Sequence, residues 1–239
     1  MTLWQLKCRG IDHDMEQRIL PAMPFSLFAA LVTACLSDIL FRWRHFCAHP
    51  TGLGMTFYGG IVGFIVFWWM YARRKGLDFA FLMDLFLPSV AVAQAFGRIG
   101  CFFGGCCHGR PVSAWGVVFP EGAPAFLQYG NCMVAPVQLY ESAWLFVVGF
   151  VLFTLVRFGN RWMWYLILVG AGRFLLEFLR GDVRLDFGPG FPLSPAQCIS
   201  TLIVVYGIFH VLRKLAVEPN PNIIHHQQLV KAKKGKAKP

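Results

Sequence analysis

Residues 79–111 read FAFLMDLFLPSVAVAQAFGRIGCFFGGCCHGRP, and this stretch places Arg98 at the end of a long apolar run. An α-helix from Phe79 to Arg98 would rise about 28 Å, close to the apolar thickness of a bilayer. Glycines, cysteines and a histidine crowd the residues that follow, from Gly100 to Gly109. The stretch therefore predicts a membrane-spanning helix that ends in a polar, glycine-rich loop.

The composition extends this interpretation to the whole chain. Of the 239 residues, 56% are hydrophobic and only 14% are charged, which is less charge than a soluble domain of this length carries. We expect an all-α polytopic membrane protein with about six transmembrane helices and outward-facing loops. The predicted spans are 20–41, 56–71, 79–103, 137–156, 162–179 and 194–212. A polar lead-in (1–19) precedes this transmembrane domain (20–212), and a basic tail (213–239) follows it.

The chain has a net charge of +10, and the distribution of its positive residues predicts its orientation in the membrane. The positive residues lie in loops and in the tail, and no basic face is interleaved with aromatics, so nucleic acid is not an expected partner. Because cytoplasmic loops are enriched in Lys and Arg, the C-terminus is predicted to be cytoplasmic and the loops 104–136 and 181–193 to lie outside. Arg42 and Arg44 then fall on the outer side, where we expect an amphipathic arm. The residues expected inside are Arg73, Arg74, Lys75, Arg157 and Arg161.

Arg98 is the first candidate functional residue. An arginine near the end of a span can reach the interface with its long side chain, which is the plain structural explanation. Its neighbours Gly97 and Gly100, however, leave room for a ligand to approach. A guanidinium beneath glycine N–H groups suits a phosphate or a phosphate ester.

Two further spans carry charged residues at the same predicted depth. Arg173 and Glu177 are spaced i,i+4 and share a helix face, which Arg180 continues. Such a pair can be purely structural. Together with Arg98 and with Glu141 at the start of the fourth span, it predicts a polar cavity that opens to the outer leaflet.

The cysteines form a third group with the pattern C-x4-C-C-H, made by Cys101, Cys106, Cys107 and His108. This is not zinc-ribbon spacing, so no metal ligands and no cofactor are assigned. A thiolate near Arg98 and His108 could act as a nucleophile or a base. The alternative is a set of small residues that pack a tight loop.

These motifs, in this order, resemble those of the prolipoprotein diacylglyceryl transferase family of bacterial inner membranes, in a divergent, cysteine-containing branch. The resemblance covers about residues 30–212. It rests on Tyr58-Gly59-Gly60, Gly97-Arg98-Ile99-Gly100-x-Phe102 with Gly109, Gln138-Leu139-Tyr140-Glu141, Gly172-Arg173-Phe174 with Glu177, and Gln197.

The resemblance implies an activity, partners and a location. The chain would transfer a diacylglyceryl group from phosphatidylglycerol to the lipobox cysteine thiol of a prolipoprotein and release glycerol-1-phosphate. Its partners would be a phosphatidylglycerol-like phospholipid, a lipoprotein precursor peptide and the bacterial inner (cytoplasmic) membrane. The oligomeric state is not predicted.

The resemblance also implies roles for particular residues. The expected catalytic residues are Arg98, Arg173, Glu177, Tyr58, Cys106 and His108. The expected substrate-binding residues are Gly59, Gly60, Gly97, Gly100, Cys101, Gly109, Gln138, Tyr140, Glu141 and Gln197.

The chain departs from the family at polar positions. Cys101 stands where asparagine is usual, Cys106 where glutamate is usual, and Tyr58 where histidine is usual; Ala135 replaces another common histidine. The base that deprotonates the acceptor thiol is therefore left open among His108, Tyr58 and Cys106. The family also has seven spans, so its first helix is expected to be missing here.

Three alternatives remain open at this point. One is a divergent relative that uses the same lipid-phosphate pocket with another acceptor. Another is a membrane thiol-redox or metal-binding protein built on the cysteines. The third is an inert paralogue that binds lipid.

Overall fold

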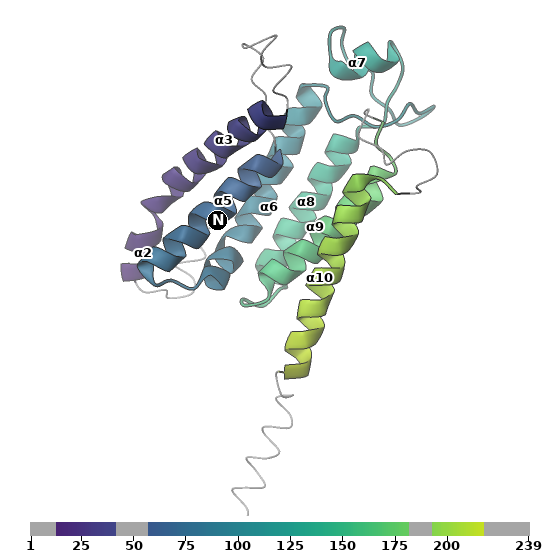
Figure 1. Cartoon of the computed structure of the whole chain (residues 1–239). Helices are drawn as coiled ribbons and strands as arrows, with labels where there is room; N and C mark the ends of the chain where they lie inside the picture. The colour runs from purple at the N-terminus through teal and green to yellow at the C-terminus, as the bar shows by residue number, and fades with distance from the viewer. Residues whose placement is uncertain (1–12, 42–56, 182–192, 218–239) are drawn as a thin grey trace, which may run out of the picture. The chain divides into compact units, whose positions relative to one another are not determined.

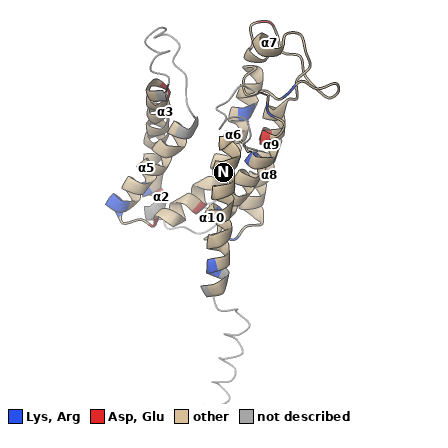
Figure 2. Ribbon diagram, turned by 45° about the vertical axis from the view of Figure 1, so that its right-hand side comes forward, with Lys and Arg blue, Asp and Glu red and all other residues tan. Residues whose placement is uncertain are grey.

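The computed structural model describes residues 13–41, 57–181 and 193–217, in which every regular element is a helix (Figure 1). The chain divides into two compact units, residues 1–89 and 90–239. Each unit is considered by itself below. Uncharged side chains dominate the helices of both units, as Figure 2 shows.

The first unit contains α2 (His13–Ile19), α3 (Ala22–Phe41) and α5 (Phe57–Lys75). Helices α3 and α5 pack closely because Gly59 and Gly63 form a small-residue stripe on α5. A Cβ at Gly59 would lie 2.6 Å from Thr33 O, and one at Gly63 would lie 2.9 Å from Ala29 O. Both positions therefore require a residue without a Cβ for this close helix contact.

Helix α6 (Phe79–Phe103) has the bounds predicted for the third span. It begins after Asp78, whose Oδ1 accepts the backbone N–H of Ala80 at 3.0 Å, as an N-cap residue does. Pro88 lies inside the helix, beside the boundary between the two units. In the first unit, Phe86 packs on the fully buried Trp68 with ring centroids 4.4 Å apart.

The second unit joins the last part of α6 to α8 (Val137–Thr154), α9 (Arg161–Glu177) and α10 (Pro195–Val217). Its core includes Ala91, Val148 and Leu152. In a membrane the lipid tails are as apolar as these side chains, so close packing and interhelical hydrogen bonds hold the helices together. One such bond runs from Ser142 Oγ of α8 to the carbonyl of Ala95 in α6, at 3.0 Å.

A compact cap follows α6 and covers one end of this unit (Figure 1). It spans residues 104–136 and includes the short helix α7 (Pro124–Tyr129). The segment around Gly109 forms bridges on two sides: Gly109 pairs with Arg180, and Pro111 pairs with Val134. The first bridge ties the cap to the residues that follow α9, and the second joins two segments within the cap.

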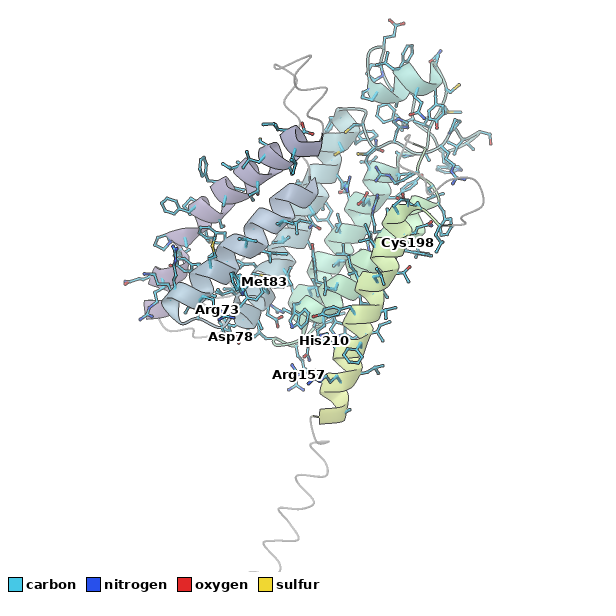
Figure 3. All side chains as sticks on the ribbon, viewed as in Figure 1. Arg73, Asp78, Met83, Arg157, Cys198 and His210 are labelled. Atoms are coloured by element: carbon cyan, nitrogen blue, oxygen red, sulfur yellow. The ribbon has the colours of Figure 1, made fainter. Side chains whose placement is uncertain are left out.

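The opposite end of the unit carries basic residues. Arg161 is buried and donates to Phe153 O at 3.0 Å, which satisfies a carbonyl at the C-terminus of α8. Lys214 of α10 donates to Gly159 O at 2.9 Å. Figure 3 places Arg157 and His210 toward this end and Cys198 nearer the other end of α10.

The prediction of an all-α polytopic membrane protein is confirmed. Four helical segments are long and apolar enough to cross a membrane by their length and composition: Glu16–Leu40, Phe79–Phe103, Val137–Thr154 and Pro195–Lys214. The other two predicted spans are the helices α5 and α9, so the number six stays a prediction. Helix α9 has 17 residues, and α5 continues past the predicted end at residue 71 through its basic residues to Lys75.

The structure adds two short helices to the predicted segments and leaves two other predictions outside the described residues. The polar lead-in (1–19) contains the short helix α2, and the predicted outer loop 104–136 contains the short helix α7. The arm with Arg42 and Arg44 and the tail beyond Val217 lie outside the described residues. Proline at the start of α7 occupies the first helical turn, where its missing N–H costs nothing.

Candidate active site

Glu141 lies at the centre of a charged cluster formed by α6, α8 and the end of α9. Its Oε1 lies 3.0 Å from Arg98 Nη2. Its Oε2 lies 3.6 Å from Arg180 Nη1 and 3.9 Å from Arg173 Nη1. Arg173 Nη2 also lies 3.0 Å from Glu177 Oε2, one helical turn along. The structure thus brings together the four charged residues whose convergence the sequence suggested, and adds Arg180.

The cluster is buried and rich in arginine. Glu141 and Glu177 are each 8% exposed, and Arg180 is 6% exposed. Its described members include three arginines and two glutamates. Three guanidinium groups gathered at one buried carboxylate are donors that suit an anionic ligand such as a phosphate.

Two buried oxygens of this region accept no hydrogen bond within the part of the chain that the structure describes. They are Glu141 Oε2 and Gln138 Oε1, both on α8. The amide nitrogen of Gln138 is occupied, because it donates to Cys106 O at 2.7 Å. Buried acceptors normally have donors. These two oxygens can therefore receive hydroxyl or N–H groups of a ligand.

Glu177 is held from the start of α10. Ser194 Oγ donates to Glu177 Oε1 at 3.1 Å. Ser194 and Gln197 also form a capping box: Gln197 N donates to Ser194 Oγ at 3.2 Å, and Ser194 N donates to Gln197 Oε1 at 2.9 Å. The observed contacts of Gln197 are those of a helix cap, while its expected role in substrate binding stays a prediction.

The glycines beside Arg98 face open space. A Cβ at Gly97 or at Gly100 would meet no atom within 4 Å, and both positions are exposed. Helix contact therefore does not require glycine there, in contrast to Gly109, where a Cβ would lie 2.6 Å from Ala135 O. This leaves the face of α6 next to Arg98 accessible, while the substrate-binding role of Gly97 and Gly100 stays a prediction.

The three cysteines of the central motif lie together at the end of α6. Their sulfur atoms are all within 4.8 Å of one another, and each residue is partly buried. The pKa of the Cys107 thiol lies well below its ordinary value, because Cys101 donates a hydrogen bond to it and Arg180 lies beside it. Burial raises the pKa of Cys106, which favours its neutral thiol.

The other expected site residues have varied surroundings. His108 is 2% exposed, with Nδ1 3.2 Å from Gly109 O and its ring edge-on to Tyr129. Tyr140 is 40% exposed on α8. Tyr58 lies in the first turn of α5 in the other unit, as do Gly59 and Gly60, and its side chain lies outside the described residues.

Two residues with contacts in the cluster were not among the expected site residues. Arg180 continues the stripe of Arg173 and Glu177, and that spacing could have indicated its place beside Glu141. Ser194 opens the pattern Ser-x-x-Gln, which is a capping-box signature. The contact of Ser194 with Glu177 depends on how α9 and α10 pack, which no local pattern encodes.

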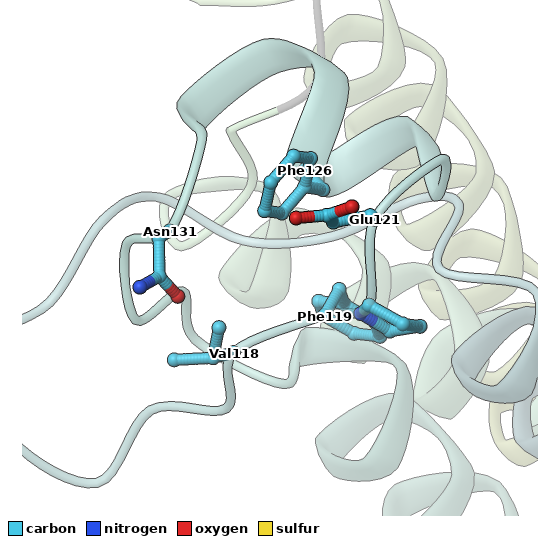
Figure 4. Close-up of a pocket in the computed structure, with 6 residues that line it drawn as sticks. Val118, Phe119, Glu121, Phe126 and Asn131 are labelled. Carbon is cyan, nitrogen blue, oxygen red and sulfur yellow. The ribbon is translucent and has the colours of Figure 1, made fainter.

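Two hollows lie in the second unit. An apolar groove of about 360 Å³ between α8 and α9 is lined by Tyr140, Ala143, Trp144, Val147, Gly172, Leu175 and Leu176. A second hollow of about 460 Å³ lies in the cap between Val118, Phe119, Glu121, Phe126 and Asn131 (Figure 4). The described residues that line the second hollow include no Lys or Arg, so it does not suit a phosphate as the Glu141 cluster does.

Comparison with known proteins identifies the class. A family profile of prolipoprotein diacylglyceryl transferases matches residues 1–213. The chain belongs to this family, which consists of multi-pass transferases of the cytoplasmic membrane.

Individual relatives support the same family assignment. The chain is 39% identical over 165 residues to the phosphatidylglycerol–prolipoprotein diacylglyceryl transferase of Clostridium tetani, a match that covers 66% of this chain and 63% of the relative. It is 32% identical over 222 residues to the enzyme of that name from Clostridium novyi, covering 87% of this chain and 82% of the relative. The corresponding protein of Dehalococcoides mccartyi is 28% identical over 221 residues, with 88% and 82% covered. Family membership, with relatives matched over most of the chain, supports the activity expected from the sequence.

Proposed function

We propose that this chain transfers the diacylglyceryl group of phosphatidylglycerol to the lipobox cysteine thiol of a prolipoprotein, and that the Glu141 cluster binds the phosphate of the lipid. The observation that carries the proposal is the convergence of Arg98, Arg173 and Arg180 on the buried carboxylate of Glu141. Guanidinium groups are the donors that suit the phosphodiester of the lipid.

Arg98 and Arg173 have the main roles in this proposal. In the reaction, the bond between the glycerol carbon and the phosphate oxygen breaks, and negative charge grows on the departing glycerol-1-phosphate. Fixed guanidinium groups in a buried site stabilise that charge more strongly than water does. Glu141 holds Arg98 in place across the interface between α6 and α8, and Glu177 holds Arg173 along α9.

The two buried oxygens of α8 that accept no hydrogen bond suit the headgroup of the lipid. Phosphatidylglycerol ends in a glycerol with free hydroxyls, which can donate hydrogen bonds to Gln138 Oε1 and Glu141 Oε2. A cationic headgroup would instead bring a positive charge next to three arginines. The site therefore favours a neutral polyol headgroup.

An apolar surface for the lipid tail adjoins the cluster. The groove between α8 and α9 begins at Tyr140, the neighbour of Glu141, and continues along Trp144 and Val147. Its lining is almost entirely apolar, which suits an acyl chain that enters from the bilayer.

The proposed arrangement in the membrane has six spans: α3, α5, α6, α8, α9 and α10. The cap and the Glu141 cluster lie on the outer side, and the basic end of the second unit, with Arg157 and Lys214, faces the cytoplasm. Because six crossings are an even number, both ends of this set of spans lie on the same side, and the basic end of α10 places the C-terminus in the cytoplasm. Such an arrangement presents the site to precursors exported across the membrane.

The test is a transfer assay with purified protein, phosphatidylglycerol and a peptide that carries a lipobox cysteine. The expected product is a thioether-linked diacylglyceryl peptide, identified by mass, together with glycerol-1-phosphate. Phosphatidylethanolamine, the matched donor with a cationic headgroup, should give no product. Absence of product from phosphatidylglycerol with a chain that is folded in detergent would overturn the proposal.

A further inference from the structure

The end of α6 is built so that two cysteines of the central motif meet. Gly105 has φ +63°, and two hydrogen bonds close the helix: Gly105 N to Phe102 O at 3.1 Å and Cys106 N to Cys101 O at 3.2 Å. This is the Schellman motif, in which the side chains at the positions of Cys101 and Cys106 normally touch. The spacing C-x4-C around Gly105 is therefore a consequence of how the helix ends.

The next residue brings a third sulfur to the same place. Cys107 has φ +55°, a left-handed conformation that costs about 1–2 kcal/mol for a residue with a Cβ. In this conformation its sulfur lies with those of Cys101 and Cys106, and all three are within 4.8 Å of one another. Thiol packing alone would not require a side chain in a conformation that favours glycine.

The surroundings of the sulfurs are suited to negative charge. Arg180 hydrogen-bonds to Cys107, and Arg98 lies close enough to act on both Cys101 and Cys107. Arg180 also lies 3.6 Å from Glu141 Oε2, so the cysteines adjoin the phosphate cluster. Gln138 connects the two groups a second time through its bond to Cys106 O.

Three clustered thiolates match the ligand preference of zinc. Tetrahedral zinc with Zn–S bonds of about 2.3 Å holds its sulfur ligands about 3.8 Å apart, so the cluster need contract by no more than about 1 Å. The complex of one zinc ion with three thiolates carries a charge of −1, which Arg180 offsets. Three protein ligands leave the fourth position open, as in zinc sites that do chemistry rather than hold a fold.

We propose that Cys101, Cys106 and Cys107 bind one zinc ion and that its fourth position takes the thiol of the acceptor peptide. The second half of this inference rests on the proposed transferase function. At the polar family positions that Cys101 and Cys106 occupy, the metal supplies a means of turning the acceptor thiol into a thiolate.

The step balances as follows. On coordination the acceptor S–H gives its proton to solvent, because a metal-bound thiol is deprotonated. The sulfur electron pair then forms a bond to the glycerol carbon of the lipid. The bond from that carbon to the phosphate oxygen breaks, its electron pair leaves with glycerol-1-phosphate, and the zinc ion keeps its charge throughout.

The metal site is tested without any measurement of transfer. The purified chain should hold about one zinc ion per molecule, and Co²⁺ in its place should show thiolate-to-metal charge-transfer absorption. Cys101→Ser, Cys106→Ser and Cys107→Ser should each weaken Co²⁺ binding by more than about tenfold, since each removes a ligand. Cys132→Ser is the matched control, because Cys132 is exposed in the same cap and lies outside the cluster. A wild-type chain that binds no Co²⁺, or Ser variants that bind it as the control does, would overturn the metal site.

The fourth position is tested with the peptide. A lipobox peptide with cysteine should shift the Co²⁺ spectrum, and the same peptide with serine should not. An unchanged spectrum would overturn the role of the metal in thiol activation. The Ser variants are compared only where they elute from size-exclusion chromatography in detergent as the Cys132→Ser control does. Should none of the Ser variants do so, alkylation of the three cysteines in the folded wild-type chain replaces them, and zinc bound before alkylation should protect them.

Failures of the two proposals have different signatures. If the chain binds metal through the three cysteines but forms no diacylglyceryl peptide, the metal site stands and the transferase proposal fails. If metal-free chain transfers the lipid as fast as metal-loaded chain, the transferase proposal stands and the zinc inference fails.

Discussion

Arg98 of α6 and Glu141 of α8 form an ion pair of 3.0 Å at the end of the second unit where the cap begins. The pair links two helices that are far apart in sequence. It also fixes the guanidinium next to the open face of Gly97 and Gly100. One contact therefore serves both the packing of the helices and the position of the proposed phosphate-binding group.

The substitution Glu141→Gln measures how much the ion pairs of Glu141 contribute to the stability of the fold. The substitution keeps the shape of the side chain but removes the one carboxylate that Arg98, Arg173 and Arg180 share. Breaking a buried ion pair from one side costs about 3–5 kcal/mol. We expect a clear fall in the thermal unfolding midpoint in detergent. Glu121→Gln, at an exposed position in the cap, should leave the midpoint unchanged; equal midpoints for the two variants would contradict the central place of Glu141.

The substitutions Arg98→Ala and Arg173→Ala measure how much each arginine contributes to the rate of transfer. Each removes a charged donor from the proposed phosphate site, and loss of one such donor lowers turnover about 10²–10³-fold. The measurement is the initial rate of formation of the diacylglyceryl peptide. Arg157→Ala is the control, since Arg157 is exposed at the opposite end of the unit (Figure 3). Rates near that of the control would show that neither arginine stabilises the leaving group.

Much of the helical framework could be predicted from the sequence. The apolar run from Phe79 to Phe103 predicts α6 with the bounds that the structure has. Helices α3 and α8 lie within two residues of their predicted bounds, and α10 extends five residues past its predicted end. Long apolar segments are strong local signals, and local signals are what a sequence pattern carries.

The cap and the connections of the cluster could not be predicted to the same degree. The cap depends on bridges such as that between Gly109 and Arg180, which join residues 71 positions apart. The bond from Ser194 to Glu177 likewise depends on the packing of α10 against α9. Long-range contacts of this kind leave no periodic pattern, so the sequence indicated which residues are polar but not how they are connected.

The packing of the cap is tested by Gly109→Ala. The backbone of Gly109 lies against Ala135 and Gly181, and a Cβ would lie 2.6 Å from Ala135 O. Since that atom is part of the backbone, it cannot move away cheaply, and we expect a loss of about 1–3 kcal/mol. The readout is faster proteolysis within residues 104–136. Gly104→Ala is the control because its nearest neighbour would lie 3.5 Å away. A cap that resists protease equally in both variants would contradict the close packing.

The orientation is tested by labelling Cys132. This residue is exposed in the cap, which the proposed topology places outside. A membrane-impermeant maleimide added to intact cells or spheroplasts should modify it, and mapping by mass should find the label on the peptide that contains Cys132. The Cys132→Ser variant should lose that labelled peptide. Modification only after the membrane is opened would place the cap, and with it the Glu141 cluster, on the cytoplasmic side.

The function of Gln197 is separated from its structural contacts by two substitutions. In the capping box, Gln197 Oε1 accepts the N–H of Ser194, and glutamate can do the same at this position. Gln197→Ala should therefore lower stability by about 0.5–2 kcal/mol, while Gln197→Glu should unfold close to wild type. Thr201→Ala, one turn further along α10, removes only a bond from the side chain to its own helix and serves as the control. If Gln197 acts only as a cap, Gln197→Glu also transfers lipid at the wild-type rate. If it contacts the phosphate, the added negative charge lowers that rate while the unfolding midpoint stays unchanged, and the expected role in substrate binding is then established.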